Sequence, residues 1–202
     1  MSVNKNPPLK TVANRSKKAR PKATPSRIQE NISSAKAIVD QEIVDNTVLH
    51  VAETEGLTVA DLPDTQVSVP LNLWLEETDA IKSRDGLVAV QIGVDEHPED
   101  IADTLNDVDM VVLPFVNHVD GQAYSHAYKL RTRLGFKGEI RAIGDVKFDQ
   151  LGFLTRVGCN AFELPETENL ETALRAFGEF SDFYQPSADG ARNIFSRRRA
   201  VH

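Results

Sequence analysis

Short apolar segments alternate with amphipathic segments through most of this chain, and this alternation constrains the fold more than any other feature. The apolar segments have the length and composition of buried strands, and those between them have helical spacing. The expected strands are 87–93, 110–115, 139–143 and 161–164, and the expected helices are 70–82, 98–105, 124–134, 146–157 and 170–183. Such alternation produces right-handed crossovers. The expected fold class is α/β, with a small mainly parallel sheet of about four strands and flanking helices, as an open sheet or a half-barrel.

The first apolar segments of the folded body have a different pattern. Residues 37–39 and 42–51 resemble two strands of an N-terminal β-hairpin, with Asp40-Gln41 at the turn. Residues 57–66 are expected to form mostly loop.

The 202 residues are enough for one domain of ordinary size. We expect a disordered basic tail at 1–34, a single α/β domain at 35–185 and a flexible basic tail at 186–202. An apolar fraction of 41% with 26% charged residues is typical of a globular protein, and no apolar run is long enough to span a bilayer. The single cysteine, Cys159, excludes an intrachain disulfide and a cluster held by this chain's cysteines alone. These features predict a cytoplasmic protein.

The charge is distributed unevenly along the chain. Residues 1–27 contain eight basic residues and no acidic residue. Because the whole chain carries −7 and this segment +8, the remaining 175 residues carry −15. An acidic body repels phosphates, so we expect no binding of nucleic acid except through the basic tail.

Two polar, glycine-containing turns follow expected strands and precede expected helices. They are Asp120-Gly121 and Gly144-Asp145. Parallel strands end at one edge of a sheet, so both turns are predicted to lie side by side there. Exposed N–H groups at helix N-termini favour an anion, although helix capping alone also explains such residues. Tyr124 and Asp145 are the candidates for proton transfer.

An arginine lies within an expected buried strand. Arg141 needs a carboxylate or an anionic ligand, because desolvating a guanidinium alone is very costly. Asp120 and Asp145 are the predicted partners, and a structural salt bridge and a ligand-facing arginine both remain open.

The predicted ligand site combines the two turns with neighbouring polar residues on a single concave surface. Its members are Asp120, Gly121, Tyr124, Ser125, Arg131, Arg141, Gly144, Asp145 and Gln150. The five histidines have no metal-ligand spacing, so no metal site is predicted.

Several motifs together resemble the bacterial family known as domain of unknown function 934. They are Val69-Pro70-Leu71-x-Leu73-Trp74-Leu75, Asp120-Gly121-x-x-Tyr124-Ser125-x-Ala127-x-x-Leu130-Arg131, Gly138-Glu139-Ile140-Arg141-Ala142-x-Gly144-Asp145-Val146, Asp149-Gln150-Leu151 and Ala161-Phe162-Glu163-Leu164. The resemblance runs from about residue 37 to 184. Gln122 and Ala123 stand where the family has Arg-Gly, which removes one anion contact if that arginine binds an anion.

Members of this family have been labelled "oxidoreductase probably involved in sulfite reduction". The resemblance therefore implies an accessory or electron-transfer-associated protein of assimilatory sulfite or sulfate reduction. Its partner would be sulfite reductase or another sulfate-assimilation protein, and its redox chemistry would need a bound flavin or the partner's redox centre. Two alternatives remain: a small enzyme that binds an anionic metabolite at the carboxyl ends of the strands, and a structural scaffold.

Overall fold

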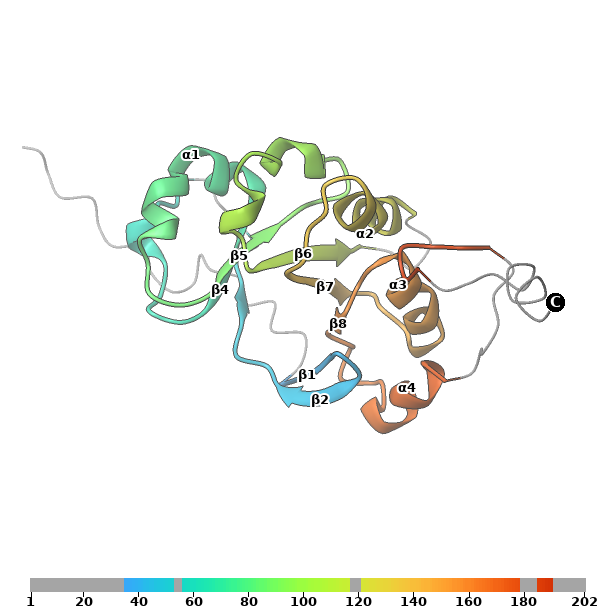
Figure 1. Cartoon of the computed structure of the whole chain (residues 1–202). Coiled ribbons are helices and arrows are strands. Elements are labelled where there is room, and N and C mark those ends of the chain that lie inside the picture. Colours follow the sequence, from blue (N-terminus) through green and yellow to red (C-terminus); the bar gives the residue numbers. More distant parts are fainter. Residues whose placement is uncertain (1–34, 53–55, 117–120, 179–184, 191–202) are drawn as a thin grey trace, which may run out of the picture.

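The computed structural model describes residues 35–52, 56–116, 121–178 and 185–190 (Figure 1). Both predicted tails fall largely outside these ranges, and so does Asp120. The domain boundaries at 34 and 185 therefore stay predictions. None of the described helices has the length and apolar composition that a membrane span requires.

The described elements form a mixed α/β fold. The strands are β1 (Lys36–Val39), β2 (Glu42–Asp45), β3 (Leu49–His50), β4 (Val67–Pro70), β5 (Val88–Gln91), β6 (Met110–Phe115), β7 (Glu139–Gly144) and β8 (Ala161–Phe162). The α-helices are α1 (Leu71–Lys82), α2 (Gln122–Thr132), α3 (Leu151–Val157) and α4 (Leu170–Ala176). Four 3₁₀ segments are η2 (Val59–Asp61), η3 (Pro98–Ile101), η4 (Leu105–Asp107) and η5 (Phe148–Gln150).

All eight strands belong to one sheet, which curls strongly into an open half-barrel (Figure 1). The strand order is β2-β1-β8-β7-β6-β5-β4-β3. Neighbours from β3 to β8 pair in parallel, whereas β1 pairs antiparallel with both β2 and β8. The prediction of a small, mainly parallel sheet of about four strands was therefore wrong in both strand number and strand direction, because the sheet has eight strands and is mixed. The α/β class and the half-barrel alternative are confirmed.

The predicted N-terminal hairpin forms, but it is shorter than expected. Asp40 and Gln41 have φ angles of 48° and 68°. Positive φ at both central residues is the requirement of a two-residue type I′ turn, whose twist matches that of the flanking strands. The second predicted strand, 42–51, divides into β2 and β3, which lie at opposite ends of the strand order. No local pattern indicates this division, because both pieces have strand-like composition.

Two further elements differ from the sequence prediction. The expected helix at 98–105 consists of η3 and the residues leading to η4. Strand β4 at residues 67–70 was missed, because its four residues end at Pro70, directly before α1. Pro70 has a φ of −60°, which suits the residue that precedes a helix.

Alternate residues of each strand point to opposite faces of the sheet. On the convex face, strand residues such as Val90, Val111 and Ile140 pack with helix residues such as Leu130 and Leu154 in the main hydrophobic core. On the concave face a small apolar cluster contains Val48, Ala89, Met110, Val112 and Ile143. The remaining concave positions near it are polar, and they form the first candidate site.

Candidate functional site

The concave face carries a group of buried and half-buried polar side chains that hydrogen-bond to one another or to nearby backbone, called here the polar network. Its members are Asn46, His50, Ser68, Gln91, Glu139, Arg141 and Glu163. His50, Ser68 and Glu163 have exposed fractions of 1%, 0% and 0%. They come from β3, from β4 and from the residue that follows β8. Strand curvature brings them together, because β3 and β8 are separated by four other strands in the sheet.

His50 lies at the centre of one half of the network. Its Nε2 is 2.9 Å from Oε1 of Glu163, and its Nδ1 is 2.6 Å from Oγ of Ser68. A proton on Nε2 of His50 is donated to Glu163, while Nδ1 accepts from the Ser68 hydroxyl in a neutral ring and donates to it in a protonated ring. This order of groups is also found in activated serine nucleophiles. Both ends of the chain are fully buried, however, so a substrate cannot reach Ser68 in this conformation.

Arg141 forms the other half of the network. Its Nε donates to Oε1 of Glu139 at 2.6 Å, and its Nη1 donates to Oε1 of Glu163 at 2.8 Å and to Oδ1 of Asn46 at 3.0 Å. The predicted burial of Arg141 is confirmed, since 5% of the residue is exposed. The predicted partners, Asp120 and Asp145, are not the carboxylates found beside it. Glu139 precedes it by two residues on the same face of β7, a spacing that the sequence showed and that we overlooked.

Glu163 keeps its charge because of its neighbours. Desolvation raises the pKa of its carboxyl group, but the hydrogen bonds and charges of His50 and Arg141 together hold that pKa below its ordinary value. Oε1 of Glu163 thus contacts both His50 on β3, the outermost parallel strand of the sheet, and Arg141 on β7, four strands away in the strand order. We assign the polar network a structural role, in which it holds the sheet in its curled form.

The second candidate site is the carboxyl edge of β6 and β7, where the predicted turn at Gly144-Asp145 lies. The backbone N–H of Asp145 donates to the Phe115 carbonyl at 2.9 Å, and Phe115 is paired with Gly144. The prediction that the two strand ends lie side by side is therefore confirmed. Gly144 has a φ of 92°, and a Cβ there would lie 2.5 Å from the Phe115 carbonyl oxygen, so this turn requires glycine.

Tyr124 and Gln150 meet at this edge, as predicted. The Tyr124 ring contacts Phe115 edge-on and Phe153 at a tilt, with ring centroids 5.3 Å apart in both pairs. Burial raises the pKa of the Tyr124 hydroxyl, nearby Cys159 and Asp149 raise it further, and a hydrogen bond with the Gln150 side chain only partly offsets these effects. Tyr124 therefore holds its proton at neutral pH, which suits a hydrogen-bond donor better than a base.

Several large apolar side chains are exposed around this edge. Val116 is 70% exposed, Phe153 55% and Phe148 42%. We call the surface formed by Val116, Tyr124, Phe148, Gln150 and Phe153 the edge surface. The sequence contained a signal for it, since a phenylalanine at an outward position of α3 breaks the amphipathic pattern.

The remaining predicted site residues are distributed differently. Gly121 and Ser125 are exposed, and the Ser125 hydroxyl donates back to the Gly121 carbonyl within α2. Asp145 is half-buried, and Asp120 lies outside the described residues. Arg141 belongs to the concave face, whereas Tyr124 and Gln150 lie on the convex side with α2 and α3. The predicted single concave surface therefore does not form as a unit, although ligand binding by its individual members stays a prediction.

Arg131 lies at the opposite edge from the predicted site. It donates to the carbonyls of Phe136, Gly138 and Gly158 at 2.7–2.8 Å, and to Oδ1 of Asn160. These acceptors precede β7 and β8, at the amino ends of the strands. Arg131 was predicted to share the site with the turn at 120–121, but it lies in the last turn of α2, which carries it to the opposite edge of the sheet.

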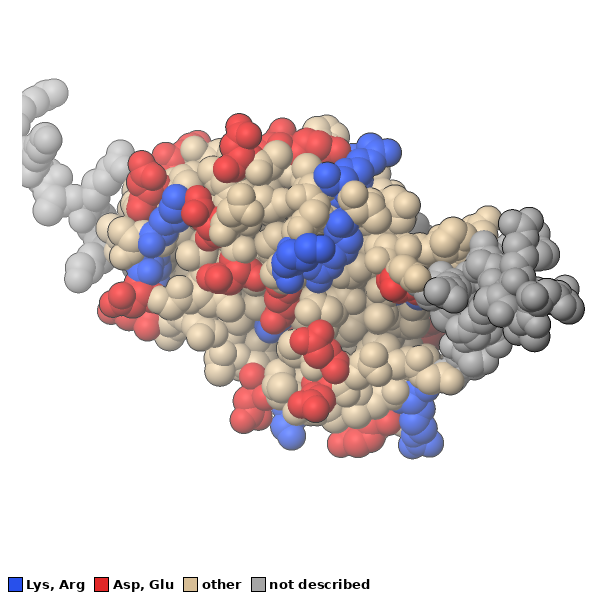
Figure 2. Space-filling model, in the orientation of Figure 1, with Lys and Arg blue, Asp and Glu red and all other residues tan. Residues whose placement is uncertain are grey.

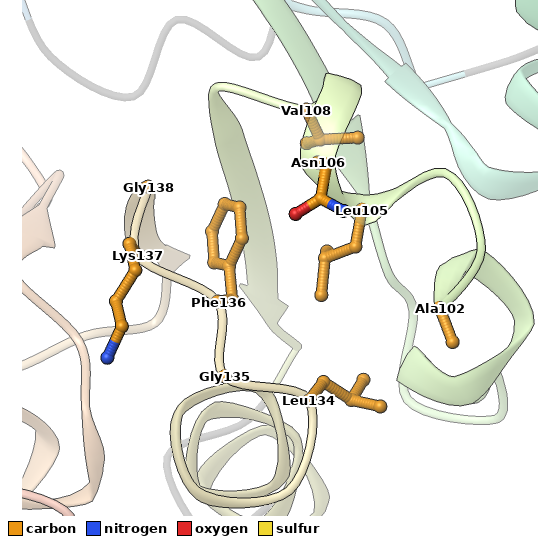
Figure 3. Close-up of a pocket in the computed structure, with 9 residues that line it drawn as sticks. All are labelled: Ala102, Leu105, Asn106, Val108, Leu134, Gly135, Phe136, Lys137 and Gly138. Atoms are coloured by element: carbon orange, nitrogen blue, oxygen red, sulfur yellow. The ribbon is translucent and has the colours of Figure 1, made fainter.

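A pocket of about 200 Å³ also lies at the amino ends (Figure 3). It is lined by Ala102, Leu105, Asn106, Val108, Leu134, Gly135, Phe136, Lys137 and Gly138. Phe136 faces Leu105 and Asn106, while the Lys137 side chain points away from both. Most of the side chains around the pocket are apolar, but the surface that the pocket exposes is mainly polar, and the charged end of Lys137 points away from Leu105 and Asn106.

Fold and sites together define an α/β half-barrel protein with a buried polar network on its concave face and an exposed aromatic surface at its carboxyl edge. A family model described as "Bacterial protein of unknown function (DUF934)" matches residues 89–195, more than half of the chain. The chain belongs to this family. No curated protein matches it. The matched region contains the edge surface and Arg141, but it begins after His50 and Ser68.

Proposed function

We propose that this protein is an accessory protein of assimilatory sulfite reduction that binds sulfite reductase through the edge surface. The observation that carries the proposal is the exposure of Phe153 beside Tyr124 and of Phe148 in η5, because exposed aromatic side chains are enriched at protein interfaces. The pathway comes from the family label given above. The partner could equally be another protein of sulfate assimilation.

The charge of the protein supports a docking role. Outside residues 1–27 the chain carries −15, and the face in Figure 2 shows acidic side chains along both margins of the body. An acidic body is steered towards a basic partner surface, and such steering weakens with added salt. The acidic surface would steer the protein towards the partner, and the exposed aromatic rings would then form the desolvated contact with it.

The redox part of the proposal needs an electron-carrying group, and the single cysteine of this chain is not suited to that role. Cys159 is buried, and burial raises the pKa of its thiol to about 12, despite the nearby Arg131. A thiol that stays protonated is a poor nucleophile and a poor redox group. Electron transfer would therefore use a bound flavin or the redox centre of the partner.

The alternative of an enzyme acting on an anionic metabolite has less support. That reading relied on Arg141 as the anion-binding residue. Arg141 already contacts two carboxylates, those of Glu139 and Glu163. These two carboxylates match or exceed the positive charge of Arg141 and His50 together, so no net positive charge is left to hold an additional anion.

The direct test is binding to purified sulfite reductase at low ionic strength. Phe153→Ser should weaken the complex by about tenfold or more if the ring is a central contact. Leu75→Ser is the matched control, because Leu75 is 52% exposed on α1, outside the edge surface. Equal binding by both variants would remove the edge surface from the interface, and absence of any complex would remove sulfite reductase as the partner.

A deletion strain tests the pathway separately from the interface. Growth on cysteine but not on sulfite as sole sulfur source would place the protein at sulfite reduction. Unimpaired growth on sulfate, sulfite and cysteine would contradict the pathway assignment.

A further inference from the structure

Two polar atoms of the network are not engaged by the described part of the protein. Arg141 uses Nε and Nη1 for its three hydrogen bonds, and no described residue accepts one from its Nη2. Gln91 donates through Nε2 to the carbonyls of Val51 and Ser68, and no described residue donates to its Oε1. Among the side-chain nitrogens and oxygens of the described residues, neither of these two is both fully buried and without a hydrogen-bond partner, so these two atoms are not fully buried. Both atoms therefore reach space that a solvent molecule can enter.

The side chains that carry these atoms are themselves almost fully buried. Arg141 is 5% exposed and Gln91 is 9% exposed. Their other polar atoms are fixed by hydrogen bonds to the protein. Each side chain is therefore held in one position and presents a single unused hydrogen-bonding atom, which is the arrangement of a preorganised binding group.

The two groups lie on the same face of the sheet, with one strand between them. Gln91, Val112 and Arg141 occupy the same register on β5, β6 and β7. The Gln91 amide reaches the carbonyl of Val51, while Arg141 and His50 share Oε1 of Glu163. His50 and Val51 are consecutive, with Cα atoms about 3.8 Å apart. Gln91 and Arg141 thus both extend towards the same point of the chain, over the apolar side chain of Val112.

The charges of the network select the kind of ligand. Arg141 contacts two carboxylates, so even with a protonated His50 the network has no net positive charge to attract an anion. An anion is disfavoured there, and a cation cannot accept a hydrogen bond from an N–H donor. An uncharged group that carries both an acceptor and a donor satisfies Nη2 and Oε1 together.

We propose that the concave face binds an uncharged amide-like group, which accepts a hydrogen bond from Nη2 of Arg141 and donates one to Oε1 of Gln91. Carboxamides and the amide edges of heterocyclic rings belong to this class. The Val112 and Ile143 side chains, in the apolar cluster of the same face, provide the surface beneath such a group. This site is separate from the edge surface, so it does not depend on the proposed interaction with sulfite reductase.

The test uses the full-length protein with ¹⁵N-labelled arginine, because the Nε–H of Arg141 is fixed on Glu139 and gives a protected NMR signal. Uracil and acetamide serve as uncharged probes, and acetate and sulfite serve as anionic probes. We expect a saturable shift of the Arg141 signal with uracil or acetamide and a weaker response to the anions at equal concentration. Uracil should also give intermolecular NOEs to the methyl groups of Val112 and Ile143.

Variants link the response to the two atoms. Gln91→Met keeps the length of the side chain and removes Oε1, so it should weaken uracil binding by about tenfold. Gln66→Met is the matched control, since Gln66 is exposed and outside the network. If Gln91→Met does not fold, the NOEs in the unmodified protein still decide the question. Absence of a saturable shift and of NOEs would leave only water at these atoms, and tighter binding of the anions would contradict the assigned ligand class; either result overturns the proposal.

Discussion

The two faces of the curled sheet are built from the same strands but are stabilised in different ways. The convex face buries aliphatic and aromatic side chains against four helices. The concave face combines five buried apolar residues with a charged, hydrogen-bonded network. Apolar packing is non-directional and tolerates substitution of similar volume, whereas a buried charge depends on specific partners. Substitution of a single interacting residue should therefore lower the free energy of unfolding most on the concave face.

The largest effect is expected from Arg141→Ala. It leaves the Glu163 carboxylate buried without its guanidinium, which should lower the free energy of unfolding by roughly 3–5 kcal/mol. The double variant Arg141→Met/Glu163→Leu removes both charges and should lose less than the single variant. Urea denaturation of the three proteins measures the difference. A double variant less stable than Arg141→Ala would show that the pair is not coupled in this way.

A somewhat smaller effect is expected from Leu130→Ala on the convex face. Leu130 is fully buried in the main core, and truncation of a buried leucine costs about 2–5 kcal/mol, depending on how far the cavity collapses. Leu130→Met, which conserves most of the volume, should cost less than about 1.5 kcal/mol. Equal losses in the two variants would show that shape, rather than buried volume, limits this part of the core.

The faces should also differ in their response to pH. Glu163 has a folded-state pKa below its ordinary value of 4.5, so its ionised form is favoured in the folded protein. Its contribution is complete above the unfolded pKa and is lost as the pH falls through the lower folded pKa. The stability advantage of the unmodified protein over Glu163→Gln should therefore shrink below about pH 4.5. The advantage of the unmodified protein over Leu130→Ala should change little across the same range, and a parallel decline would contradict the assignment.

The smallest effect concerns Cys159, which is buried in the convex core. Because burial raises its thiol pKa to about 12, the native protein should react with a thiol reagent far more slowly than the urea-unfolded protein. Without urea, the rate of thiol labelling should be set by how fast the core around Cys159 opens, because the thiol is not exposed in the folded protein. Rapid labelling of the folded protein would show that this part of the convex core opens readily.

The sequence predicted the convex side better than the concave side. Helical and strand periodicity reports which positions are apolar, and apolar positions such as Leu130, Leu154 and Ile140 are the ones that form the convex core. The hairpin turn at Asp40-Gln41 and the adjacent ends of β6 and β7 also follow from local pattern and topology. The edge surface was predicted in part, because Tyr124 and Gln150 meet there.

The concave network was not predictable by the same reasoning. Arg141 was recognised as a buried charge, but its partner Glu163 is 22 residues away, and His50 is 113 residues from Glu163. Nothing in the local pattern around His50 indicates that it contacts Glu163 after β8 and Ser68 on β4. Arg131 shows the converse error, since its position on the same helix as Tyr124 suggested a shared site that helix length prevents.

By itself, the sequence determined the α/β class, the apolar positions of the main core and the need to neutralise Arg141. These follow from short-range periodicity and from the cost of burying an unpaired charge. Only the tertiary structure decided how many strands join the sheet, where Arg131 lies and which residues neutralise Arg141. The physical reason is curvature. The curl of eight strands brings β3 to β8, and contact between residues so distant in the chain depends on the whole sheet rather than on any segment of it.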